Sequence, residues 1–217
     1  MSDIHYIVEN IERSVLVLGP GIVLDKDGKS LQSGFTERYS LRNKGLIKYY
    51  FDHDNLIRPK NSATRLTIQK NFADFYETEF TEKAKSLYQR ISQIPYPLII
   101  SLNPDKTLIE CFDGLGTDYI FDFYIKGKKS LTNEVGTKDK PFLFNLLGCY
   151  TEPESLILTY DDLFEYLRNI LPGDGLPTSI RTILRDAENI IFLGVEFDKW
   201  YFQLLVKLLT EFDEKYE

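Results

Sequence analysis

The feature that most constrains this chain is a series of short apolar runs, each closed by glycine, proline, asparagine or aspartate. Such runs are too short to be buried helices, and they are apolar throughout rather than alternating, which is typical of strands in a parallel sheet covered on both faces. Helical patterns separate them, so we predict an α/β fold: a three-layer, Rossmann-like domain with a mainly parallel sheet. The runs cover residues 14–18, 97–102, 119–124, 142–147 and 189–193.

Helices are expected in the segments between these runs. Proline at positions 95 and 97 ends one of them, because proline lacks the donor that a helix interior needs. Thr159 is a predicted N-cap. Residues 155–159 are expected to be extended, residues 126–140 to form a loop, and residues 31–93 to be a helical insertion in a single domain spanning 1–217. The predicted helices are 3–13, 70–93, 106–113, 160–171, 177–187 and 198–214.

Charge argues against general nucleic-acid binding. The formal net charge is -7 and the pI is about 5.0, and an acidic surface repels phosphate backbones. Lys126, Lys128 and Lys129 form a short basic cluster, which we interpret as a solvated loop. No apolar run reaches the roughly 18 residues of a membrane helix, and the N-terminus has no signal-peptide pattern. We therefore expect a cytoplasmic protein without a membrane partner.

Metal-binding residue types are scarce. The chain has two cysteines, Cys111 and Cys149, and two histidines, His5 and His53. These numbers exclude a four-cysteine zinc ribbon and a three-histidine site. We predict two reduced, buried thiols and no zinc.

Small and polar residues follow four of the predicted strands. Gly19-Pro20-Gly21 permits a tight turn and the close approach of a pyrophosphate, although a plain structural turn remains the alternative. Asn103 and Asp105 can bind a ribose or simply hold their loop. Gly148 and Gly194 end two more strands. Because parallel strands bind ligands beyond their carboxyl ends, we expect these residues to meet at a pocket the size of adenosine diphosphate.

Taken in order, these segments resemble the sirtuin-like superfamily, specifically its zinc-free prokaryotic branch. The resemblance covers nearly the whole chain and is carried by the set rather than by any single motif. The segments that carry it are 19–21, 101–105, 145–149, 155–163 and 192–200.

The resemblance implies an NAD site. It assigns Gly19, Pro20 and Gly21 to the phosphates, and Asn103 and Asp105, as candidate catalytic residues, to the nicotinamide and ribose side. It assigns the late strand end to the adenosine half. Members of this branch often act in bacterial antiphage defence as NAD-consuming modules joined to sensor proteins. The remaining residues that the resemblance places at the cofactor are Gly148, Gly194 and Asp198.

Leu147 stands where the family has the histidine that acts as the base, and a leucine cannot accept a proton. Deacylase chemistry is therefore not expected, and NAD hydrolysis stays open. The first hypothesis is a module that binds NAD or a related nucleotide and acts as a sensor or assembly module in antiphage defence. The second is an active NAD glycohydrolase whose base is displaced to His53 or Asp52. The third is a protein-interaction domain with a collapsed pocket.

Three consecutive aromatic residues suggest how the chain meets partners. Trp200, Tyr201 and Phe202 cannot all face the core, because successive helical residues lie about 100° apart. One of them is expected to be exposed or in an interface. Two partner arrangements are compatible with this: a homodimer, and docking to a larger defence protein.

Overall fold

The computed structural model describes residues 3–127, 133–171 and 175–210. Its centre is a five-stranded sheet with the order β5-β6-β4-β1-β7, and every neighbouring pair is parallel. This confirms the predicted α/β, Rossmann-like fold and all five strand positions. The strands are β1 (Ser14–Leu18), β4 (Leu98–Ser101), β5 (Ile120–Phe123), β6 (Phe142–Asn145) and β7 (Asn189–Leu193).

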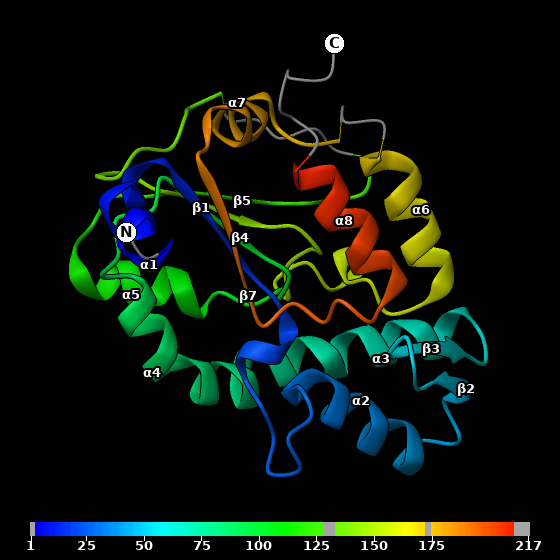
Figure 1. The fold of residues 1–217 in the computed structure, drawn as a ribbon. Helices are drawn as coiled ribbons and strands as arrows, with labels where there is room; N and C mark the ends of the chain where they lie inside the picture. Colours follow the sequence, from blue (N-terminus) through cyan, green and yellow to red (C-terminus); the bar gives the residue numbers. More distant parts are fainter. Residues whose placement is uncertain (1–2, 128–132, 172–174, 211–217) are drawn as a thin grey trace.

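Helices cover both faces of this sheet (Figure 1). Successive strand residues point to opposite faces, so Val15 and Val17 pack in one core cluster and Leu16 and Leu18 in the other. The first cluster includes side chains of α6, α7 and α8, and the second includes side chains of α4 and α5. These helices are α4 (Thr81–Ile91), α5 (Thr107–Leu115), α6 (Tyr160–Ile170), α7 (Thr178–Asp186) and α8 (Trp200–Thr210).

The first helix is shorter than predicted. We expected a helix over 3–13, but α1 covers Asp3–Glu9 and a 3-10 turn follows at Ile11–Arg13. Asn10 separates the two. Its side-chain amide donates to the carbonyl oxygen of Tyr6 at 3.0 Å, and asparagine readily exchanges helical geometry for such local bonds.

Residues 31–75 form a small layer below the carboxyl ends of the strands (Figure 1). It has an apolar cluster of its own, in which Tyr39, Ile57 and Phe72 pack. Helix α3 begins at Ser62, earlier than the predicted residue 70, because the side chains of Asn61 and Thr64 cap its start reciprocally. The elements are α2 (Leu31–Arg42), a hairpin of β2 (Ile47–Phe51) and β3 (Leu56–Pro59), and α3 (Ser62–Phe75).

The single helix predicted over 70–93 is wrong in a second respect. Residues Tyr76–Phe80 form a π-helical turn between α3 and α4. The wider turn lets Phe75, Tyr76 and Phe80 all face the core, where the ring centres of Tyr76 and Phe80 lie 5.4 Å apart. The apolar residues over 70–93 do not keep a constant helical spacing, and the wider π turn changes the local period so that they still face the core.

Strand β7 is an edge strand with half-buried residues, and Leu193 is 42% exposed, so this strand is covered less completely than the sheet's central strands. Residues 155–159 begin at the end of a 3-10 turn (Pro153–Ser155) and are extended at Leu156 and Thr159, in agreement with the prediction. The predicted N-cap is confirmed, since the Thr159 hydroxyl accepts a bond from the amide of Asp162. In α8, Tyr201 and Phe202 are buried and Trp200 is the partly exposed ring.

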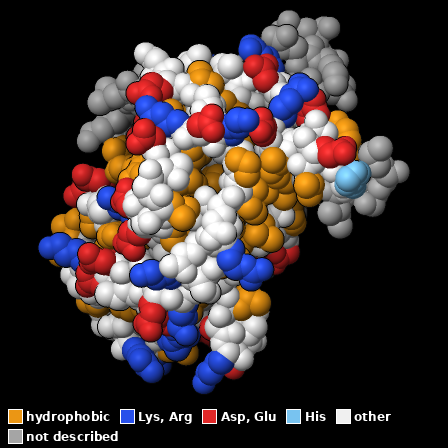
Figure 2. Space-filling view, turned by 90° about the vertical axis from the view of Figure 1, so that its left-hand side faces the viewer, with side chains coloured by type: hydrophobic (Ala, Val, Ile, Leu, Met, Phe, Trp, Pro, Cys, Tyr) orange, Lys and Arg blue, Asp and Glu red, His pale blue; other side chains and the backbone are white. Residues whose placement is uncertain are grey.

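Charged groups of both signs are mixed on the surface. On the face shown in Figure 2, acidic and basic side chains alternate around apolar ones. Lys126 pairs with Glu165, while Lys128 and Lys129 lie outside the described residues. Cys111 and Cys149 are buried and free, as predicted. In the described parts of the chain, no helix is long and apolar enough to span a membrane.

Candidate functional site

The glycine turn after β1 lies against the end of β7. The amide of Gly19 donates to the carbonyl oxygen of Leu193 at 2.8 Å, and that of Gly21 donates to Gly194 at 2.8 Å. Pro20 has no amide hydrogen, and the amide of Ile22 donates back to Gly19 at 3.3 Å. A Cβ atom at residue 19 would lie 2.3 Å from the Gly194 oxygen. The glycines thus permit two backbones to approach closely, and the turn's amides are already bonded within the protein.

Asn103 and Asp105 follow β4 and belong to one buried polar cluster. The Asn103 side-chain amide donates to the carbonyl oxygen of Gly19 at 3.2 Å and to the Tyr88 hydroxyl at 3.4 Å. That hydroxyl lies 3.5 Å from Asp105 Oδ2. The Asn103 side chain is wholly buried, yet its Oδ1 has no hydrogen-bond partner among the described residues. A buried acceptor without a partner costs stability, which makes Asn103 a candidate ligand-binding group.

The Asp105 carboxyl is held in an unusual electrostatic state. Burial raises its pKa from the usual 3.8 to about 6, and hydrogen bonds from Thr107 oppose that rise. The amide of Thr107 donates to Asp105 Oδ1 at 2.8 Å, and the Asn145 side chain donates to the Asp105 carbonyl at 2.7 Å. A buried carboxyl with a perturbed pKa, here beside the unpartnered Asn103 Oδ1, is typical of functional sites.

A small cavity lies between the strand ends and the layer formed by α2 and the hairpin; Asn103, Asp105 and Tyr88 do not line it, and Pro20, the neighbour of the Gly19 that Asn103 contacts, does. The cavity volume is about 30 Å³, which is room for roughly two water molecules. Among the described residues that line it, Lys199 is the charged one; it is buried, and its ammonium group pairs with Glu196. The other lining residues are Pro20, Gln32, Asn55, Leu56, Leu147, Ile157, Leu163, Tyr201 and Phe202.

The remaining predicted site residues take different positions around this cavity. Gly194 contacts the glycine turn. Gly148 follows Leu147 in a turn with φ +94° and packs against Ser155. Asp198 is exposed and does not line the cavity, whereas its neighbour Lys199 does.

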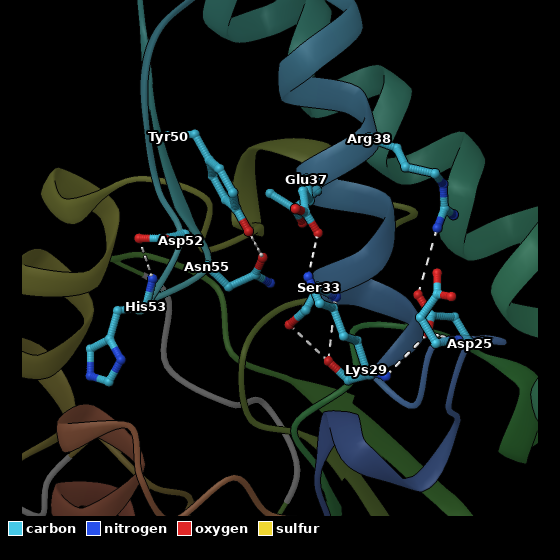
Figure 3. Close-up of polar contacts among 12 residues, drawn as sticks. Asp25, Lys29, Ser33, Glu37, Arg38, Tyr50, Asp52, His53 and Asn55 are labelled. Atoms are coloured by element: carbon cyan, nitrogen blue, oxygen red, sulfur yellow. Dashed lines mark hydrogen bonds and ion pairs between the residues drawn. The ribbon is translucent and has the colours of Figure 1, made fainter.

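The two proposed displaced bases do not reach the cavity. His53 and Asp52 are exposed at the turn of the hairpin, where the Asp52 carboxylate accepts from the His53 amide. Figure 3 shows the His53 ring on the side of the hairpin away from α2, whereas Asn55 faces α2. Neither side chain supports the glycohydrolase hypothesis in this arrangement.

Comparison with known families agrees with the fold. The sequence model of the SIR2-like domain matches residues 97–215, more than half of the chain. This chain belongs to the SIR2-like family. No curated protein has a significantly similar sequence. The matched span of the SIR2-like domain contains Asn103, Asp105, Leu147 and Lys199, and it begins after the glycine turn and the hairpin layer.

The closed cavity does not fit the nucleotide that SIR2-like domains generally bind. Asn103 Oδ1 is a suitable unpartnered acceptor. However, the described amides of the glycine turn are already bonded, and Tyr201 and Phe202 line a cavity of only about 30 Å³. This cavity, formed by described residues, is far smaller than the expected pocket of adenosine diphosphate size. Among the described residues, no cluster of three or more histidine, cysteine or acidic side chains could hold a metal ion.

Sequence reasoning missed Tyr88 and Lys199. Tyr88 lies on the apolar face of α4 and looks like an ordinary core residue in the sequence. Lys199 gave one usable signal: it immediately precedes α8, where the helix dipole disfavours a cation. A lysine at that place needs a local partner, which Glu196 provides.

Proposed function

We propose that this SIR2-like domain binds NAD or a related nucleotide at the carboxyl edge of its sheet, without deacylase chemistry. The observation that carries the proposal is Asn103, a fully buried amide whose oxygen has no partner, beside the titrating Asp105. Leu147 lines the cavity where the resemblance expects the base, so no imidazole is there to accept a proton.

Binding requires the closed cavity to open. Because about 30 Å³ cannot hold a nucleotide, the layer that covers the strand ends must move away from α6 and α8. The bound nucleotide would then meet Asn103 and Asp105 on its ribose side. With the site opened, Lys199 is the one charged group among the cavity-lining residues that could pair with a phosphate.

Calorimetric titration with NAD tests this proposal, with Asn103→Ala as the variant. We expect saturable binding by the wild type, at least tenfold weaker binding by the variant because a polar contact to the ligand is lost, and no release of nicotinamide by either protein. Asn189→Ala is the matched control, since Asn189 bonds Ser14 at the opposite edge of the sheet.

Nicotinamide release by the wild type that Asn103→Ala abolishes would contradict binding without turnover and favour the glycohydrolase. Equal NAD affinity in the wild type and Asn103→Ala would remove Asn103 from the site. Thermal unfolding of each variant shows whether it has kept its fold.

A second function is favoured by a different observation. Tyr201 and Phe202 line a cavity of only about 30 Å³, as expected for a domain that has lost its ligand and serves in assembly. Absence of binding to NAD, ADP-ribose and ATP by the wild type would support this protein-interaction alternative.

The setting that we propose for either function is bacterial antiphage defence, in which the domain acts as a sensor or assembly module. This part of the proposal rests on the sirtuin-like resemblance alone. A homodimer, or docking to a larger defence protein, is the corresponding partner proposal. Sedimentation over a range of concentrations tests the homodimer, which a monomer at high concentration would contradict.

A further inference from the structure

We propose that the β2–β3 hairpin is a latch, held by Asp54, that closes the candidate site and must be released before a nucleotide enters. The consequence for nucleotide entry rests on the proposed function. The opening of the hairpin does not, and it can be measured without any ligand.

One residue of the hairpin, Asp54, makes hydrogen bonds to both α6 and α8. Asp54 lies in the hairpin turn, where its carboxylate accepts a bond from the Tyr160 hydroxyl on α6. Its carbonyl oxygen accepts a bond from the Tyr201 hydroxyl on α8 at 3.0 Å. Asn55 and Leu56, the next two residues, line the cavity, as does Tyr201. These bonds therefore connect the hairpin directly to the opposite wall of the cavity.

Apolar packing and a few polar contacts also hold the hairpin in place: its buried Ile47, Leu56 and Ile57 belong to the core clusters. The amide of Ile57 donates to the carbonyl oxygen of Leu158 at 2.9 Å. The rings of Phe51 and Tyr160 pack edge to face at 4.7 Å. A two-stranded sheet is marginally stable by itself, so the position of this hairpin depends on what fastens it.

The closed position of the hairpin keeps a charged side chain buried at a cost in free energy. Asp54 is 8% exposed, and its second oxygen, Oδ1, has no partner among the described residues. Release of the hairpin would return this carboxylate to water and end the cost of an unpaired buried acceptor. Burial and the Asp54 carboxylate raise the pKa of Tyr160 to about 12, so its hydroxyl keeps the donated proton at neutral pH.

The latch makes the apparent affinity for a nucleotide depend on the fraction of molecules in which the hairpin is open. When only the open form binds, the apparent dissociation constant is the intrinsic constant divided by the open fraction. Removing one hydrogen bond that exists only in the closed form increases the open fraction by roughly 2- to 10-fold. The apparent affinity for NAD then rises by the same factor, although no ligand contact has been added.

Tyr160→Phe is the test, because it deletes the hydroxyl and keeps the ring that packs on Phe51. Tyr166→Phe is the matched control, since its buried hydroxyl is on the same helix and has no partner among the described residues. Hydrogen exchange of the Ile57 amide measures opening without ligand. The single tryptophan, Trp200, whose ring centre lies 5.8 Å from that of Tyr201, gives a second signal from the α8 side.

We expect Tyr160→Phe to accelerate exchange at Ile57 by roughly 2- to 10-fold and to tighten NAD binding by a similar factor, while Tyr166→Phe changes neither. Unchanged exchange at Ile57 would overturn the latch, whatever binds. Faster exchange with unchanged NAD affinity would contradict the proposal that the hairpin controls the entry of a nucleotide. Faster exchange in a protein that binds no nucleotide, with or without the substitution, would support the opening and contradict the proposed function instead.

Discussion

At the scale of single residues, the candidate site is defined by polar groups that the fold keeps buried at a cost. Asn103 has an acceptor without a partner, and Asp105 retains a carboxyl whose pKa burial raises to about 6. Core positions do not need such groups, and an apolar pair would avoid both penalties. Stability sacrificed in this way is typical of functional positions.

This cost predicts that Asp105→Asn stabilises the protein at neutral pH. Because the folded-state pKa is raised above the unfolded value, the folded state binds the proton more tightly, and stability falls as pH rises from about 4 to about 6. The ionised carboxyl therefore costs about 3 kcal/mol at pH 7.5. Asparagine keeps an acceptor for Thr107 and removes the charge.

Urea unfolding at pH 4.5 and 7.5 measures this effect. We expect the variant to gain about 3 kcal/mol at pH 7.5 and much less at pH 4.5. A variant that is equally stable or less stable than the wild type at pH 7.5 would show that the buried carboxyl carries no such penalty.

Part of the residue-scale pattern could be predicted from the sequence. Asn103 and Asp105 were identified because polar residues directly follow a predicted strand, and the structure brings both into one cluster. Tyr88 could not be identified, because its place on an apolar helix face is that of an ordinary core residue. The partners of its hydroxyl become apparent only in the folded structure.

At the scale of elements, the junction of β1 and β7 explains the glycine turn. The two strand ends approach so closely that Gly19 must lack a side chain, irrespective of any ligand. The strands themselves were predictable, because continuous apolar runs closed by turn residues have few other solutions. The hairpin was not, since β2 alternates poorly and its turn uses Asn55 at φ 55° instead of a glycine.

The junction predicts that Gly19→Ala destabilises the protein without any ligand. A new Cβ would lie 2.3 Å from the Gly194 oxygen, a distance that forces the two backbones apart. We expect a loss of at least about 2 kcal/mol in the free energy of unfolding.

The control for this experiment is Gly114→Ala. Gly114 lies in α5 with no atom within 4 Å of the added Cβ, so we expect a gain of about 0.5–1 kcal/mol from helix propensity. A Gly19→Ala protein of wild-type stability that fails only in NAD binding would instead assign the glycine to the ligand.

At the scale of the whole molecule, the hairpin layer covers the carboxyl ends of the strands of a SIR2-like fold. The family resemblance correctly indicated the parallel sheet, and the matched span confirms the family. The state of the pocket was not predictable, because its walls come from segments far apart in the chain: the hairpin, α6 and the start of α8. Burial of Tyr201 and Phe202 there depends on the hairpin, which no strand or helix pattern had indicated.

The crystal structure of the protein grown with saturating NAD tests the central claim most directly. We predict a nucleotide at the carboxyl edge of the sheet, within hydrogen-bond distance of Asn103, with the β2–β3 hairpin released from Tyr160 and Tyr201. A structure with Asp54 still bonded to both tyrosines, and no nucleotide beside Asn103, would contradict it.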